Sequence, residues 1–271
     1  KSKKPLIVAG NGVKQSNTAG DLKKIINNLK IPVLLSRFAI DIFPHKNKFV
    51  YGLGGIKGSR YCKKIMKNSD LIISLGCRLA PQFVGHDFKT FVGAKVISVD
   101  IEKDELKKKG QKIDFPMNYD LTEFMPELSK QSNSNSKKNY EKWNNFCFNL
   151  KKSNPIIKKI FQKNPIDLYY FMQKLGILAK KNDVLITDAG SNYYIGGQVW
   201  EFQKGQKEIT SVTNAAMGLS IPLAIGAAVA SPKQQILAVT GDGSLELNIQ
   251  ELKTISHYKF NIKLFVINNG G

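Results

Sequence analysis

The sequence predicts an α/β protein built from two doubly wound parallel-sheet domains, the second of them incomplete. Two observations carry this prediction. Short continuous apolar runs alternate with amphipathic segments along most of the 271 residues, which is typical of buried parallel strands covered by helices. A polar stretch near the middle of the chain separates two such patterns, so we expect a domain boundary there.

The first pattern predicts one Rossmann-like domain over residues 1–128. Its expected strands are residues 6–9, 32–35, 71–75 and 95–99, and residues 19–29 form a helix between the first two. Each strand ends at a glycine or a polar residue, as buried strands of a parallel sheet do. Gly10-Asn11-Gly12, directly after the first strand, fits a tight strand-to-helix turn and a loop facing a nucleotide equally well.

Residues 129–160 are predicted to connect the two domains. Residues 129–138 contain no apolar side chain, so we expect a linker or surface loop there. In residues 140–150 the side chains of Trp143, Phe146 and Leu150 recur at helical spacing. This spacing predicts a helix that packs through those three residues onto a neighbour.

The second pattern predicts another α/β domain over residues 161–271. Its expected helices are residues 166–175, 221–230 and 245–258, and its expected strands are residues 184–187, 236–240 and 262–267. The sequence stops just after the last strand, where such a domain should continue. We therefore expect this domain to be incomplete and the chain to be a piece of a longer protein.

The formal net charge of +20 comes from 41 basic and 21 acidic residues. Only three of the basic residues are arginines, and the lysines are spread over most of the chain. Nucleic-acid sites concentrate Arg and aromatic residues, because Arg grips phosphate in a fork and stacks on bases. We therefore expect the lysines to be solvated surface groups and predict no nucleic-acid binding.

Composition also bears on compartment. No apolar run reaches the roughly 20 residues of a membrane-spanning helix, so we expect no membrane association. Cys62, Cys77 and Cys147 show no paired spacing, which predicts reduced thiols in a cytoplasmic protein. The three histidines are not spaced as a metal site, and we assign them no role.

The strongest chemical signal is Gly241-Asp242-Gly243-Ser244 after one predicted strand, with Asn268-Asn269 after the next. The carboxyl ends of neighbouring parallel strands meet at one sheet edge, where open α/β sheets bind ligands. The Asp242 carboxylate and the Asn269 amide supply hard oxygen ligands for a Mg²⁺ that also holds phosphate oxygens. The glycines allow close backbone approach, and Ser244 opens a helix whose free N–H groups favour an anion.

This pattern resembles the thiamine diphosphate fingerprint of the acetolactate synthase and pyruvate decarboxylase superfamily. Two further stretches match that superfamily in the right order: residues 188–192 resemble its diphosphate loop, and residues 214–227 resemble its segment beside the pyrimidine. One short motif alone would be weak, but the joint match identifies the chain as a relative of these enzymes.

The resemblance implies a set of site residues. The cofactor-binding residues would be Ala189, Gly190, Ser191, Asn192, Ala215, Met217, Gly241, Asp242, Gly243, Ser244 and Asn269. Met217 would wedge the thiazolium against the pyrimidine of the bent cofactor, although a methionine is more often a core residue. The Mg²⁺ ligands would be Asp242, Asn269 and the main-chain carbonyl of Gly271.

The first half is similar to the central domain of the same superfamily. Residues 76–82 align with a stretch that helps hold FAD in acetolactate synthases proper. Arg78 is kept there, but Ala80-Pro81-Gln82 replaces an acidic pair and a second arginine. This replacement argues against bound FAD and indicates a separate acetolactate synthase-like branch.

By resemblance, the enzyme decarboxylates a small 2-oxo acid and transfers the resulting carbanion to an acceptor, as a homodimer or homotetramer. The family's proton-relay glutamate lies on a separate domain that we do not find in these residues. We therefore expect no catalytic residue in this chain and no turnover by it alone. Two alternatives stay open: a non-catalytic nucleotide-binding protein, and a thiamine diphosphate-dependent decarboxylase or oxidase of the same superfamily.

Overall fold

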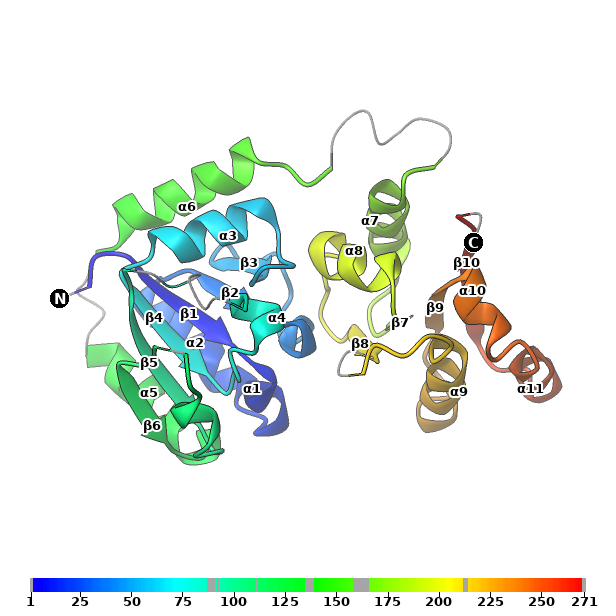
Figure 1. Ribbon diagram of the computed structural model, residues 1–271, viewed down its shortest axis with the longest axis horizontal. Helices are drawn as coiled ribbons and strands as arrows, with labels where there is room; N and C mark the ends of the chain where they lie inside the picture. The colour runs from blue at the N-terminus through cyan, green and yellow to red at the C-terminus, as the bar shows by residue number, and fades with distance from the viewer. Residues whose placement is uncertain are drawn as a thin grey trace. The chain divides into compact units, whose positions relative to one another are not determined.

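The computed structural model describes residues 2–86, 91, 93–110, 112–134, 139–157, 166–211 and 214–269. The chain divides into two compact units, residues 1–156 and 157–271. Each unit contains its own parallel sheet with helices against it (Figure 1). The predicted α/β class is confirmed. Within the described residues, no helix is both long enough and apolar enough to cross a membrane.

The first unit contains a six-stranded parallel sheet in the order β3-β2-β1-β4-β5-β6. Its strands are β1 (Pro5–Ala9), β2 (Val33–Leu35), β3 (Val50–Leu53), β4 (Leu71–Leu75), β5 (Lys95–Asp100) and β6 (Phe115–Asn118). Its helices are α1 (Asn11–Gln15), α2 (Ala19–Leu29), η1 (Arg37–Ala39), α3 (Arg60–Asn68), α4 (Pro81–Val84), η3 (Glu105–Lys107), α5 (Leu121–Ser134) and α6 (Glu141–Ser153). The four strands predicted here are all present, and β3 and β6 are additional.

The helices of the first unit cover both faces of its sheet. The connection through α2 leads from β1 to β2, whereas the connection through α3 leads back from β3 to β4 in the opposite direction. Because such crossovers are right-handed, the two helices lie on opposite faces. Side chains alternate along a strand, so β1 supplies apolar residues to both faces and is buried at every position.

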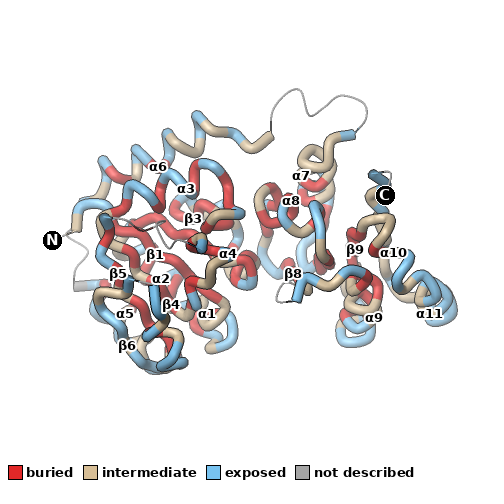
Figure 2. Tube along the Cα trace, viewed as in Figure 1, coloured by how far each residue is buried: buried red, intermediate tan, exposed pale blue. Residues whose placement is uncertain are grey.

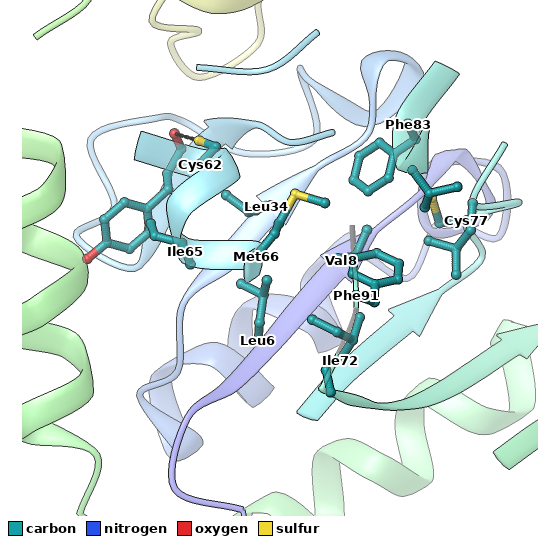
Figure 3. Close-up of a cluster of buried hydrophobic side chains, with 14 of the residues drawn as sticks. Leu6, Val8, Leu34, Cys62, Ile65, Met66, Ile72, Cys77, Phe83 and Phe91 are labelled. Carbon is teal, nitrogen blue, oxygen red and sulfur yellow. Dashed lines mark hydrogen bonds between the residues drawn. The ribbon is translucent and has the colours of Figure 1, made fainter. Parts of the chain in front are cut away.

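One core cluster of this unit lies between the sheet and the helices α3 and α6. In Figure 3, Ile65 and Met66 of α3 lie over Leu6 and Val8 of β1, and all four are fully buried. Burying each such side chain contributes about 1.5–3 kcal/mol relative to exposure. This cluster is the main reason why α3 stays on the sheet.

The helix α6 belongs to the same core. The indole Nε1–H of Trp143 donates a hydrogen bond of 2.8 Å to the carbonyl oxygen of Pro5, and Cys147 is also buried. Leu150 is partly buried against the cluster, whereas Phe146 is 40% exposed and stacks on Trp143. The predicted packing helix is present, but Cys147 occupies the inward position that was assigned to Phe146.

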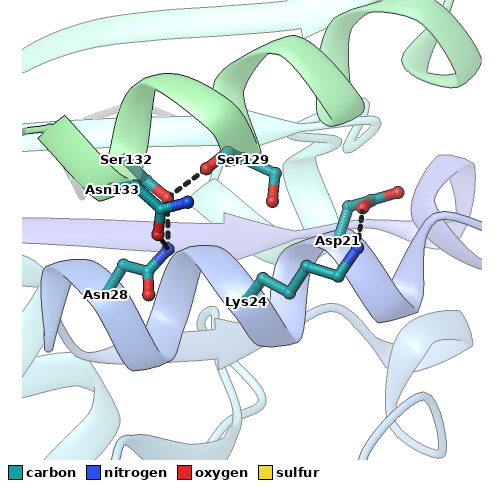
Figure 4. A network of polar contacts seen from close by, with 6 residues as sticks. All are labelled: Asp21, Lys24, Asn28, Ser129, Ser132 and Asn133. Carbon is teal, nitrogen blue, oxygen red and sulfur yellow. Dashed lines mark hydrogen bonds and ion pairs between the residues drawn. The ribbon is translucent and has the colours of Figure 1, made fainter.

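The predicted loop over residues 129–138 is wrong for its first part, because α5 continues through Ser134. Figure 4 shows how the polar residues of this segment bind α2: the Asn28 amide donates to Ser132 Oγ at 2.8 Å and to Asn133 Oδ1 at 2.6 Å. The Ser132 hydroxyl in turn donates to the carbonyl of Ser129. These bonds satisfy polar groups that composition alone assigns to a solvated loop. Residues 135–138 lie outside the described residues.

The glycines after β1 are explained by close backbone packing. The N–H of Gly12 donates to the carbonyl of Gly76 at 3.0 Å, and a Cβ added to Gly10 would stand 2.0 Å from that same oxygen. Only glycine permits this approach. Of the two interpretations left open, the strand-to-helix turn accounts for these residues.

The second unit contains a four-stranded parallel sheet in the order β10-β9-β7-β8. Its strands are β7 (Val184–Thr187), β8 (Lys207–Thr210), β9 (Ile236–Gly241) and β10 (Ile262–Ile267). Its helices are α7 (Leu168–Leu178), α8 (Ser191–Val199), α9 (Ser220–Ala230), α10 (Asp242–Glu246) and α11 (Glu251–Tyr258). The three predicted strands are present, and β8 and α8 are additional.

Two helices of this unit differ from their predicted bounds. The first begins at Leu168 because Asp167 caps it, its carboxylate accepting from the N–H of Tyr169 at 2.8 Å. The helix predicted over residues 245–258 is wrong as a single helix. It breaks between Glu246 and Glu251, where Asn248 turns its amide toward the carbonyl of Gly218 at 2.8 Å. The helix α11 contains no buried residue, as Figure 2 also shows.

We predict that Trp143→Ala lowers the free energy of unfolding of the first unit by about 3–5 kcal/mol, since it removes a large buried side chain and a hydrogen bond. The matched control is Phe148→Ala on the same helix, because Phe148 is 59% exposed. This variant should change stability by less than about 0.5 kcal/mol. Chemical denaturation measures both, and equal effects would contradict the packing of α6.

We also predict alkaline destabilisation that depends on Cys77. Burial raises the pKa of this thiol from 9.0 to about 11. The neutral thiol is therefore favoured by folding, and the stability it contributes is lost as the pH rises from about 9 to 11. Urea denaturation at several pH values should show a smaller loss for Cys77→Ala than for the wild type. Parallel curves would exclude a titrating thiol at this position.

Candidate functional site

The candidate site lies at the carboxyl ends of β7 and β9. These two strands pair directly, with β8 on the far side of β7 and β10 on the far side of β9. The connections that leave β7 and β9 therefore run in opposite directions across the sheet. Open parallel sheets bind ligands at such a reversal of strand order, because the two turns separate and leave a crevice.

The turn after β9 brings together the two strongest sequence signals. Asp242 opens α10, and its Oδ1 accepts from the N–H of Gly243 at 3.0 Å. Its Oδ2 accepts from the N–H of Asn269, beyond the end of β10, at 3.2 Å. The two segments lie 27 residues apart in the chain, and parallel pairing of β9 with β10 makes them neighbours.

This arrangement has oxygen ligands of the kind that hold a phosphate-bound magnesium ion. Among the described residues no group of three or more His, Cys, Asp or Glu side chains could hold a metal by itself. Mg²⁺ is commonly held by one or two carboxylates together with substrate phosphates and water. Asp242 and the exposed Asn269 fit that pattern. Gly271, the third expected ligand, lies outside the described residues.

The turn after β7 offers an anion site. Gly190 has a φ of 124°, and Ser191 begins the nine-residue helix α8. A Cβ added to Gly190 or to Gly241 would meet no atom within 4 Å, so the space over both turns is open. The free N–H groups at the start of α8 favour a negatively charged ligand there. Ala189 and Ser191 flank this opening in the chain.

The side chain of Asn192 faces the sheet. It is 3% exposed, and its Nδ2 donates to Asp188 Oδ1 at 2.9 Å and to the carbonyl of Val239 at 3.0 Å. Its Oδ1 is buried and has no hydrogen-bond partner within the part of the chain that the structure describes. The residue therefore supports the turn from below, and only its backbone remains for a ligand over the turn.

Two residues at this site are absent from the predicted cofactor-binding residues, although one of them, Asp188, lies in the stretch 188–192 that resembles the diphosphate loop. Asp188 is 1% exposed, and its Oδ2 accepts from the hydroxyl of Thr240 at 2.8 Å. Thr240 is itself 1% exposed and immediately precedes Gly241. A carboxylate directly after a buried strand was the available signal for Asp188. Nothing in the local sequence distinguishes Thr240 from an ordinary strand residue.

Met217 lies over the turn after β9. It is 52% exposed, and its terminal methyl carbon stands 3.6 Å from where a Cβ on Gly243 would be. The loop that carries it is held through Gly218, whose φ of 79° and contact with Leu247 exclude a side chain. Ala215 also has a positive φ, of 47°. Met217 is therefore not a core residue, and it projects beside the candidate site.

Two further residues from the sequence analysis are Ser244, which lies in the turn after β9, and Arg78, which lies in the first unit. Ser244 is 4% exposed within α10. In the first unit, Arg78 lies 3.8 Å from Glu105 as an ion pair. This pairing does not test FAD binding, so the sequence argument from residues 80–82 against FAD stays a prediction.

Comparisons with known proteins match both halves of the chain to one enzyme family. Residues 1–128 match the family described as "Thiamine pyrophosphate enzyme, central domain". Residues 188–271 match "Thiamine pyrophosphate enzyme, C-terminal TPP binding domain". The second match begins at Asp188 and contains every site residue described above.

Several similar curated proteins are named acetolactate synthase large subunits. The "Probable acetolactate synthase large subunit" of Methanococcus aeolicus is 29% identical over 284 residues, and the alignment covers 99% of this chain and 47% of that protein. The acetolactate synthase isozyme 1 large subunit of Escherichia coli is 27% identical, and the alignment covers 99% of this chain and 46% of that protein. The acetolactate synthase large subunit of Porphyra purpurea is 30% identical, and the alignment covers 99% of this chain and 45% of that protein. The chain spans less than half the length of these relatives.

We predict that Met217→Ala leaves the melting temperature of the second unit within about 2 °C of the wild type, because an exposed side chain leaves no cavity. The matched control is Met172→Ala, since Met172 of α7 is fully buried and its loss should cost about 2–5 kcal/mol. Differential scanning calorimetry measures both variants. Equal destabilisation would place Met217 in the core.

Proposed function

The chain belongs to the thiamine pyrophosphate enzyme family, and from that premise we propose that it binds thiamine diphosphate with Mg²⁺ at the ends of β7 and β9. One observation carries the proposal. The Asp242 carboxylate accepts from the N–H of Gly243 in its own turn and from the N–H of Asn269, and it directly follows Gly241, where a Cβ would meet no atom within 4 Å. A carboxylate beside free helix N–H groups is what a magnesium diphosphate requires.

The diphosphate would be held from two sides. On one side are the backbone N–H groups of residues 189–191 at the start of α8, and on the other is the turn formed by Gly241, Gly243 and Ser244. Asp242 and Asn269 would bind the metal, with the carbonyl of Gly271 as a further ligand. Negative charge on the ligand is then balanced by Mg²⁺ and by helix N–H groups, without any lysine or arginine in the set.

The adjoining loop would hold the organic part of the cofactor. Met217, exposed beside Gly243, supplies an apolar support, and the backbone of Ala215 supplies polar contacts to the pyrimidine. Met suits this role because its polarisable thioether packs well against ring systems. When bound, thiamine diphosphate supplies the electron sink for decarboxylation of a 2-oxo acid.

We extend the proposal to the reaction of the curated relatives. The parent activity is acetolactate synthase-like, with a small 2-oxo acid as substrate and transfer of its decarboxylated remainder to an acceptor. The assembly is a homodimer or homotetramer, and no residue of this chain is assigned as the catalytic acid or base. The free, buried cysteines support a reducing, cytoplasmic compartment.

The domain assignment is part of the same proposal. Residues 1–128 form the central domain, residues 161–271 form the diphosphate-binding domain, and residues 129–160 connect them. The helix α6 within that connection packs on α3 of the first unit, so the connection is anchored on one side.

We predict that Asp242→Ala weakens Mg²⁺-dependent binding of thiamine diphosphate by about a hundredfold, because it removes the only carboxylate assigned to the metal. Isothermal titration calorimetry with Mg²⁺, and again with EDTA, measures the effect. The control is Glu127→Ala, since Glu127 is a solvent-facing carboxylate of α5 whose loss should leave the affinity unchanged.

Two results would contradict the proposal. If the wild-type chain does not bind thiamine diphosphate in millimolar Mg²⁺, the binding function is wrong. If it binds equally well with EDTA, or if Asp242→Ala binds as the wild type does, then the metal assignment alone is wrong.

A further inference from the structure

A buried polar cluster lies directly beneath the proposed diphosphate site. Its members are Asp188, Asn192 and Thr240, which are 1%, 3% and 1% exposed. The Asp188 carboxylate accepts from Thr240 Oγ1 at 2.8 Å and from Asn192 Nδ2 at 2.9 Å. The Asn192 amide also donates to the carbonyl of Val239 at 3.0 Å.

These bonds cross the reversal of strand order. Thr187 of β7 pairs with Val239 of β9, so Asp188 and Thr240 follow at the same level of the sheet. Asp188 and Thr240 lie 52 residues apart in the chain, and beyond them each strand turns away. Their hydrogen bond and the bond from Asn192 to the Val239 carbonyl thus join the two segments at the point where the turns over the proposed ligand site separate.

From this geometry we infer that Asp188 is a positioning residue, which sets the spacing between the turn after β7 and the turn after β9. It does not touch the ligand, because it is fully buried below the turns. It acts through Thr240, which leads into Gly241 and Asp242, and through Asn192, which lies in the first turn of α8.

The cluster has little freedom to rearrange. A buried carboxylate oxygen that loses its donor cannot turn to water, so the donor's position is strongly constrained. Both donors to Asp188 belong to segments that carry proposed ligand contacts. A shift of either segment relative to the other would therefore leave a buried acceptor unsatisfied.

This inference rests on the proposed function, and it is tested with three substitutions in the 271-residue chain. Thr240→Val removes the hydroxyl but keeps the branched shape, and Thr240→Ser restores the hydroxyl. The matched control is Thr187→Val, because Thr187 is equally buried but its hydroxyl bonds to Glu208 and Thr210 on the β8 side.

The first readout is the affinity for thiamine diphosphate in Mg²⁺, measured by calorimetry well below the melting temperature of each variant. We expect about tenfold weaker binding for Thr240→Val, the effect of one lost hydrogen bond to a charged group. Thr240→Ser and Thr187→Val should bind within about twofold of the wild type. If these threonines had only a structural role, their substitutions would lower the melting temperature without a loss of affinity that is specific to Thr240→Val.

The second readout needs no ligand. Hydrogen exchange of residues 188–192 should become about tenfold faster in Thr240→Val, but not in Thr187→Val, if Asp188 couples the two turns. Unchanged exchange in Thr240→Val would overturn the coupling, whether or not the chain binds the cofactor. If the wild type binds thiamine diphosphate and Thr240→Val binds it with the same affinity, the inference is overturned while the proposed function stands. Absence of wild-type binding would instead overturn the proposed function.

Discussion

The direct parallel pairing of β7 with β9 is the constraint on which the candidate site depends. Since the chain leaves these neighbours in opposite directions, the turns after them diverge, and a Cβ added to Gly190 or Gly241 would meet no described atom within 4 Å. The parallel pairing of β10 with β9 then brings Asn269 to Asp242. The two turns and the Asp242–Asn269 contact follow from strand order, whereas Met217 depends on a loop with positive φ angles at Ala215 and Gly218.

The candidate site separates residues beside open space from buried residues that hold the turns. Gly190, Gly241 and Met217 border open space, whereas Asp188, Asn192 and Thr240 are buried and bonded to one another. A diphosphate and its metal need precise spacing between donors on two different segments. The buried polar cluster would set that spacing for the proposed ligand and leave the surface above it free.

The first unit shows that a reversal of strand order does not by itself make a crevice. Its reversal lies between β1 and β4, yet there Gly10 and Gly12 pack directly against Gly76. The backbone of the protein fills the position that stays open in the second unit. Glycine thus has opposite uses in the two halves: close packing of two chain segments in one, and open space beside the candidate site in the other.

The sequence by itself determined the α/β class, most strand positions and the signals at Asp242 and Asn269, because these depend on local apolar runs and on motifs that lie within a few residues. Only the tertiary structure decided the break between α10 and α11, the helical state of Ser132 and the inward orientation of Asn192. Each of these depends on a hydrogen bond to a residue more than 20 positions away. Local patterns report burial and turn chemistry, whereas such partners are set by which strands become neighbours in the sheet.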